Sequence, residues 1–114
     1  MSPITTHILD IAVGKPAAGI PVVLDFKTHA AGWQTVGEGT TDDDGRISDL
    51  LTRTEDFKVG HYRLSFDTST YFLLLGVDCF FPLVTVSFVI KNVEEHYHVP
   101  LLLSRFGYTT YRGS

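Results

Sequence analysis

The sequence is poor in cysteine and in charge, and it lacks any long apolar run. The single cysteine, Cys79, excludes a disulfide within the chain and agrees with a reducing compartment. Charged residues make up only 19% of the chain, and 9 Lys and Arg against 13 Asp and Glu give a net charge of −4. No basic face for nucleic acid or an anionic membrane can be built from that balance. No uncharged apolar stretch approaches the roughly 20 residues of a membrane span.

The first residues also lack the marks of a secretory signal. Met-Ser-Pro-Ile-Thr-Thr-His contains neither a basic segment nor an apolar segment of the kind that directs export. We therefore expect a cytoplasmic protein. A periplasmic or peroxisomal location is the alternative if a targeting segment has been removed.

What the chain does contain is a series of short apolar segments separated by glycine and proline. Apolar residues make up 44% of it, enough for the core of a single domain covering residues 1–114. The turn signals recur roughly every 8 to 12 residues, which predicts an all-β sandwich or barrel. The expected strands are residues 4–11, 20–27, 33–37, 46–51, 61–67, 83–90, 96–103 and 106–112.

One segment departs from this pattern and predicts a short helix. Asp67, Thr68 and Ser69 offer N-cap oxygens, the next residues lack turn formers, and Gly76 suits the position after a helix. We expect a helix at about residues 69–75. It should place Tyr71, Phe72 and Leu75 on the sandwich.

Three local patterns have a structural and a chemical interpretation. The thiol of Cys79 has no cationic neighbour, which favours a buried thiol over a nucleophile. Asp42-Asp43-Asp44-Gly45 is a turn rather than a calcium loop, because Leu51 stands where the last carboxylate ligand should be. His96 and His98 share a strand face and could both bind zinc, but no spacing selects a third ligand. Pro100 cannot donate a ladder hydrogen bond, so we expect irregular or edge-like structure there.

Several segments together resemble one family, the transthyretin-like 5-hydroxyisourate hydrolases. They are Thr5-Thr6-His7-Ile8-Leu9-Asp10, Asp44-Gly45-Arg46, His96-Tyr97-His98-Val99-Pro100-Leu101-Leu102-Leu103-Ser104 and the terminal Tyr108-Thr109-Thr110-Tyr111-Arg112-Gly113-Ser114. Tyr-Arg-Gly-Ser is the most specific element, since it separates these hydrolases from the hormone-carrying transthyretins. Two positions depart from the family: Arg105 replaces the usual Pro, and Leu83 replaces the usual Glu.

The resemblance implies a fold, an assembly and a reaction. The fold would be a sandwich of two four-stranded sheets with one short helix. The assembly would be a homotetramer around a central channel, with active sites at the dimer–dimer interface. The reaction would be hydrolysis of the cyclic amide of 5-hydroxyisourate, the product of urate oxidation, to 2-oxo-4-hydroxy-4-carboxy-5-ureidoimidazoline. We expect no cofactor and no metal.

The resemblance also implies the site residues. The catalytic candidates are His7, Arg46, His98 and Ser114, and the substrate-binding candidates are His7, Arg46, Tyr111, Arg112 and Gly113. Histidine can act as base or acid near neutrality, and an arginine supplies fixed positive charge for developing oxyanions. The sequence does not say which histidine is the base, and it leaves His96 as a flanking residue. Two alternative functions are a transthyretin-like carrier without catalysis and a zinc-dependent hydrolase that uses His96 and His98.

Overall fold

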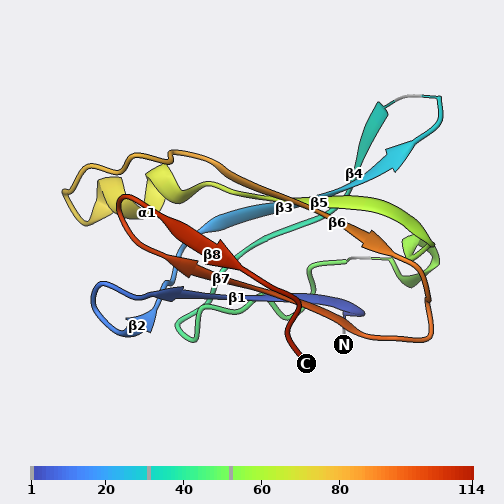
Figure 1. Ribbon diagram of the computed structural model, residues 1–114, viewed down its shortest axis with the longest axis horizontal. Coiled ribbons are helices and arrows are strands. Elements are labelled where there is room, and N and C mark those ends of the chain that lie inside the picture. The colour runs from blue at the N-terminus through green and yellow to red at the C-terminus, as the bar shows by residue number, and fades with distance from the viewer. Residues whose placement is uncertain (1, 31, 52) are drawn as a thin grey trace.

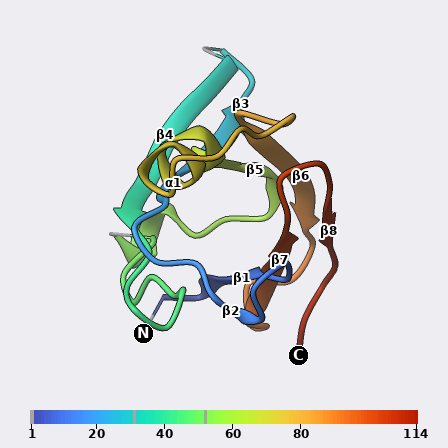
Figure 2. The same ribbon diagram turned by 90° about the vertical axis from the view of Figure 1, so that its left-hand side faces the viewer.

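The computed structural model describes residues 2–30, 32–51 and 53–114 of the chain, so Met1, Ala31 and Thr52 lie outside the described residues. The elements form two sheets that face each other across one core (Figures 1 and 2). The first sheet has the order β2-β1-β7-β8, with β1 at Ile4–Asp10, β2 at Lys15–Pro16, β7 at Tyr97–Leu103 and β8 at Tyr108–Thr110. The second has the order β4-β3-β5-β6, with β3 at Pro21–Thr28, β4 at Gly32–Thr40, β5 at Gly60–Phe66 and β6 at Val84–Ile90. The predicted all-β sandwich of two four-stranded sheets is confirmed.

Strict alternation of buried and half-buried residues sets the two faces of β1. Ile4, Thr6, Ile8 and Asp10 are buried, whereas the residues between them are half-buried. The strand runs parallel to β7, which alternates in the same way at its start. Since successive side chains of a strand point to opposite faces, one set fills the core and the other lies on the outer face of the first sheet.

The second sheet supplies more of the buried apolar residues than the first sheet does. Tyr62, Leu64 and Phe66 of β5 are fully buried, as the alternation of residues 61–67 predicts. The expected inner face of residues 83–90 is also confirmed: Val84 and Ile90 are fully buried, and Val86 and Phe88 pack against the core. β6 is an edge strand of this sheet.

The predicted helix is confirmed as α1 at Thr68–Leu74, and Asp67 caps it by accepting a hydrogen bond from the N–H of Thr70 at 3.2 Å. Phe72 is buried in the core, and the hydroxyl of Tyr71 donates to Asp10 Oδ2 at 2.7 Å. The expectation that Leu75 packs on the sandwich is wrong, because this residue is 54% exposed. Leu75 is the residue that follows the last turn of the helix as its C-cap.

Several expected strand boundaries also change. Residues 46–51 form no strand but a turn and bend that begins with a single bridge at Arg46, and the last strand is only Tyr108–Thr110. The short β2 and a 3-10 turn, η1 at Thr54–Asp56, were not expected. These segments are too short to carry the periodicity on which such predictions depend.

Pro100 belongs to β7, which lies between β1 and β8 in the first sheet, but β8 does not extend as far as Pro100. The expected irregularity is present. β8 ends at Thr110, and the chain pairs again only at the isolated bridge between His98 and Gly113. The partner strand is therefore interrupted opposite Pro100. The carbonyl oxygen of Pro100 accepts the hydroxyl hydrogen of Thr110 at 2.7 Å.

Other features bear on location and on the departures from the family pattern. No helix in the described parts of the chain is long and apolar enough to cross a bilayer. Cys79 is half-buried and packs against the core. Arg105 joins two loops at one end of the sandwich: its Nε donates to the carbonyl of Asp78 at 2.7 Å, and its own carbonyl accepts the N–H of Phe80 at 2.7 Å. Leu83 is exposed.

Candidate functional site

A tight turn, rather than a strand, positions Arg46. Asp42 Oδ1 accepts hydrogen bonds from the backbone N–H groups of Asp44 at 2.9 Å and Arg46 at 3.0 Å. Gly45 adopts a φ of 74°, and a Cβ atom at this residue would lie 2.4 Å from the carbonyl oxygen of Ile8. The carbonyl of Gly45 accepts the N–H of Ile8 at 2.9 Å, which fixes the turn to β1. The aspartate and the glycine are therefore the local reason that Arg46 lies beside the first sheet.

The first sheet brings the two expected histidines and Arg46 together. An isolated bridge pairs Arg46 with His7 on one side of β1. On the other side of β1, Thr5 lies opposite His98 of β7 in the strand register. Thr5, His7 and His98 are half-buried outer-face residues, and Arg46 is exposed. We call these four residues, Thr5, His7, Arg46 and His98, the histidine face.

The imidazole of His98 is held by its neighbours on both sides. Its Nδ1 lies 2.8 Å from the hydroxyl oxygen of Thr5. Its backbone carbonyl accepts the N–H of Gly113 at 2.8 Å. A Cβ atom at residue 113 would lie only 2.7 Å from His98 Cδ2 and 3.2 Å from Pro100 Cγ. Glycine at position 113 is therefore required for the close approach of the chain end to the ring.

The surroundings of His98 favour its neutral form. Burial, first, and then the positive charges of Arg46, His7 and His96 lower the pKa of His98 below its usual value. A neutral imidazole has one nitrogen with a free lone pair, and only this form can accept a proton. The neutral form is the one that a general base requires near neutral pH.

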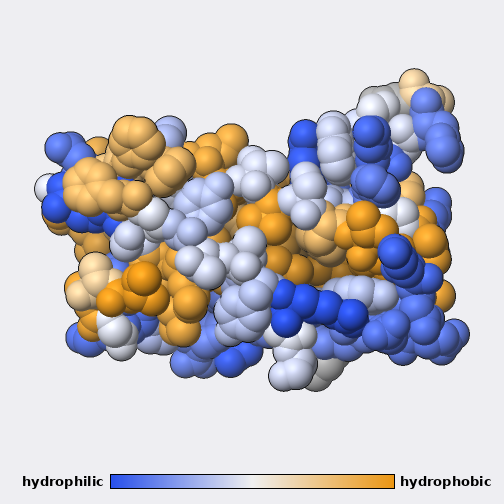
Figure 3. Space-filling model, in the orientation of Figure 1, coloured by the Kyte–Doolittle hydropathy of each residue, from blue (hydrophilic) through white to orange (hydrophobic). Residues whose placement is uncertain are grey.

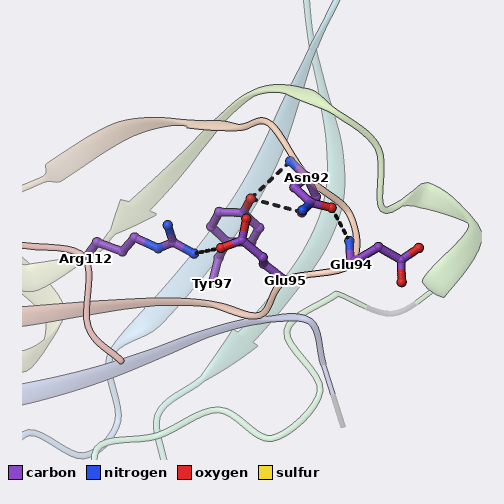
Figure 4. A network of polar contacts seen from close by, with 5 residues as sticks. All are labelled: Asn92, Glu94, Glu95, Tyr97 and Arg112. Atoms are coloured by element: carbon purple, nitrogen blue, oxygen red, sulfur yellow. Dashed lines mark hydrogen bonds and ion pairs between the residues drawn. The ribbon is translucent and has the colours of Figure 1, made fainter.

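The C-terminal motif is divided between two places. Gly113 packs on His98, and the exposed Ser114 follows it directly. Arg112 lies elsewhere: its Nη2 forms an ion pair with Glu95 Oε1 at 3.1 Å, and its guanidinium lies 4.4 Å from the centre of the Tyr97 ring (Figure 4). Tyr97 and His98 are consecutive residues of a strand, so their side chains point to opposite faces. Within one chain, Arg112 therefore does not join the histidine face.

Tyr111 and Arg112 instead line a groove at the open edge between the two sheets. The groove has a volume of about 320 Å³, and its other lining residues come from β6, β7 and the end of β8: Val86, Ser87, Phe88, Val89, Tyr97, Val99 and Thr110. Figure 3 shows apolar surface exposed along this edge between polar rims. We call it the edge groove.

His96 and His98, the two histidines of the alternative zinc site, both contact a threonine. The hydroxyl of Thr5 lies 3.2 Å from His96 Nε2 and 2.8 Å from His98 Nδ1, so both imidazoles contact one side chain. Within residues 2–30, 32–51 and 53–114, no three His, Cys, Asp or Glu side chains are grouped so that they could hold a metal. Two other histidines, His29 and His61, lie at a separate groove, whose lining residues include Phe26 and Lys58.

Sequence reasoning did not select two residues of this region. Thr5 was part of the family motif, but it received no role; its spacing of two from His7 on a strand was the available signal. Glu95, the ion-pair partner of Arg112, was missed because nothing in the sequence pairs residues 17 positions apart.

Comparisons with known proteins identify the family of the chain. A description of the HIUase/Transthyretin family matches residues 4–113. The 5-hydroxyisourate hydrolase of Salmonella dublin is 49% identical over 111 residues, which are 97% of this chain and 80% of that protein. The structure of the Klebsiella pneumoniae 5-hydroxyisourate hydrolase has 33% identity and a TM-score of 0.83, covering 97% of this chain and 98% of that one. Sea bream transthyretin in complex with thyroxine has 35% identity and a TM-score of 0.91, covering 98% and 95%. The fold alone therefore does not separate a hydrolase from a carrier.

Proposed function

The chain belongs to the HIUase/Transthyretin family, and we propose that its histidine face is the site at which it hydrolyses 5-hydroxyisourate. It is an enzyme, a hydrolase that opens the cyclic amide of this substrate. The observation that supports the site is the placement of His7, Arg46 and His98 on one outer face: Arg46 is bridged to His7, and His98 lies opposite Thr5, two residues before His7 on β1. These residues come from three separate parts of the sequence.

The reaction requires a deprotonated water, a stabilised oxyanion and a proton for the leaving nitrogen. His98 accepts a proton from water, because its surroundings favour the neutral imidazole. The hydroxide adds to the carbonyl carbon, and the fixed positive charge of Arg46 stabilises the oxyanion. The C–N bond then breaks, and the nitrogen takes a proton. His7, beside Arg46, provides the imidazole that delivers it.

The C-terminal residues complete this site. Gly113 packs against the His98 ring and donates its N–H to the His98 carbonyl, and Ser114 follows it with a hydroxyl group. Tyr111 and Arg112 reach substrate only once subunits assemble, since within one chain they line the edge groove.

The proposed assembly is a homotetramer. β6 and β8 are edge strands of the two sheets and lie side by side at the edge groove (Figure 2). Exposed edge strands present unpaired backbone groups, so pairing with a second copy satisfies them and covers the groove. Two such dimers would then enclose the histidine faces in a channel between them. Size-exclusion chromatography with light scattering tests this, and a fully active monomer would contradict it.

The proposed activity is tested by ultraviolet monitoring of freshly prepared 5-hydroxyisourate with and without the purified protein. The expected result is decay faster than the spontaneous reaction, in proportion to enzyme concentration. Activity should persist in excess EDTA, because the histidine face supplies base, acid and electrostatics without a metal. Decay at the spontaneous rate would overturn the proposed function. Loss of activity in EDTA that zinc alone restores would overturn the metal-free mechanism.

A further inference from the structure

One hydroxyl group contacts two imidazoles on the outer face of the first sheet. Thr5 Oγ1 lies 2.8 Å from Nδ1 of His98 and 3.2 Å from Nε2 of His96. A hydroxyl carries one hydrogen and two lone pairs, so Thr5 can donate to at most one of the two nitrogens and accepts from at least one of the rings. When it donates to one ring and accepts from the other, the protonation of the two rings is coupled through Thr5.

The direction of the Thr5 hydroxyl decides which nitrogen of His98 faces substrate without a proton. If Thr5 donates to His98, the proton of this ring lies on Nε2, and the ring has no lone pair left for water. If Thr5 donates to His96, it accepts from Nδ1–H of His98, and Nε2 is free as a base. The hydrogen bond at one ring nitrogen thus sets the role of the other.

We propose that Thr5 is a positioning residue that holds His98 in the tautomer with a free Nε2 and passes its Nδ1 proton to His96. This inference rests on the proposed function and extends it with a relay that neither histidine could form alone. Thr5 does not touch the reacting atoms. It acts through His98.

The relay moves one proton at each of three steps and leaves the charge on His96. Nε2 of His98 takes a proton from water while Nδ1–H of the same ring passes its proton to Thr5 Oγ1. Thr5 gives its own hydrogen to the free Nε2 of His96, which becomes an imidazolium. The hydroxide released from water forms the bond to the substrate carbon. His98 and Thr5 each gain one proton and lose one, so both end neutral.

The surroundings of the two rings favour this direction. His98 is partly buried, and the positive charges of Arg46, His7 and His96 around it oppose an imidazolium there. His96 is exposed to solvent, where a charged ring is hydrated. The charge created at His98 by water attack is therefore better placed on His96.

The test compares Thr5→Val, which removes the hydroxyl with little change of shape, with Thr5→Ser, which keeps it. Thr40→Val is the matched control, because Thr40 is an exposed strand residue of β4 in the other sheet. Thr5→Val should lower kcat about 100-fold, at the lower end of the range for positioned proton-transfer groups, with KM little changed. Thr5→Ser and Thr40→Val should stay within a few-fold of the parent protein. Equal activity of the valine and serine variants would overturn the relay.

A second measurement does not depend on turnover. Ring ¹⁵N chemical shifts at a pH above the titration of His98 report which nitrogen carries the proton. The parent protein should show the proton on Nδ1, and His96→Ala should move it to Nε2, because Thr5 then donates to His98. A parent ring protonated on Nε2, or no change in His96→Ala, would overturn the proposal even if the enzyme is active. Absence of hydrolysis with the expected tautomers would instead reject the proposed function alone.

Discussion

The histidine face and the edge groove are adjacent regions of one sandwich, yet different interactions form them. The face is a flat row of polar side chains from β1, β7 and the Asp42–Arg46 turn, fixed by backbone pairing. The groove is an apolar gap between two edge strands, with an exposed ion pair at its rim. The C-terminal segment enters both, since Tyr111 and Arg112 lie at the groove and Gly113 lies against His98. The continuous motif Tyr111-Arg112-Gly113 is thus divided between the proposed catalytic face and the proposed subunit interface.

Replacing a base of the face should have the largest effect. His98→Asn removes the proton acceptor but keeps a polar side chain on a half-buried surface. We expect kcat/KM to fall about 10²- to 10⁴-fold, the range for a positioned acid–base group, with the oligomer unchanged. His61→Asn is the control, because His61 is an exposed residue of β5 in the second sheet, outside the histidine face. Equal losses in both variants would remove His98 from the site.

Gly113→Ala tests whether the chain end positions the face. The added methyl group would lie 2.7 Å from His98 Cδ2, so the ring or the terminal segment must shift. Misplacement of a catalytic group by about 1 Å can cost about 100-fold in rate, so a large loss in kcat is expected. Gly107→Ala is the matched control, since a Cβ atom there meets only Ser104 Oγ, at 3.9 Å. Full activity of Gly113→Ala would show that the ring tolerates the shift.

Tagging the two chain ends compares the face with the rest of the molecule. A C-terminal tag extends the chain from Ser114, the residue after Gly113, which packs on His98. We expect turnover to fall about 10-fold or more relative to an N-terminal tag, because the extra chain obstructs the proposed channel. Thermal unfolding should change little. Equal rates for the two tagged proteins, measured on one substrate batch, would place Ser114 outside the site.

The titration of His98 gives a smaller but more specific readout. Arg46 is one of the charges that lower the pKa of His98, so Arg46→Ala should raise it, and the midpoint of an NMR titration should move to higher pH. The pKa of His98 is lower in the folded than in the unfolded protein, so the neutral ring stabilises the folded state at a pH above the unfolded pKa. This stabilisation is lost as the pH falls from the unfolded pKa through the lower folded pKa. A midpoint that is unchanged or lower in Arg46→Ala would contradict the described electrostatics.

The smallest effect is expected at the groove. Glu95→Gln breaks the ion pair with Arg112, whose two side chains are 49% and 56% exposed. Exposed pairs contribute at most about 1 kcal/mol, so the free energy of unfolding should change by less than that. Activity should stay within about twofold. A loss as large as that of His98→Asn would mean that the ion pair with Glu95 is needed to place Arg112 for its proposed contact with substrate in the assembled protein.

Much of the architecture could be predicted from the sequence because it depends on local patterns. Alternation in residues 61–67 and 83–90 specified two strands and their inner faces. The Asp67 cap and Gly76 specified the helix, since capping is a short-range interaction. The family motifs pointed to His7, Arg46 and His98 without any geometry.

Other features were decided only when the chain folded. Residues 46–51 looked like a strand, but docking of the turn on β1 through Gly45 and Ile8 left only a bridge. The bridging position of Thr5 between His96 and His98 depends on the parallel register of β1 and β7, whose residues are more than 90 positions apart. Neither propensity nor periodicity encodes a register between distant strands. The sequence by itself determined which residues could do the chemistry, and the tertiary structure decided which of them lie together.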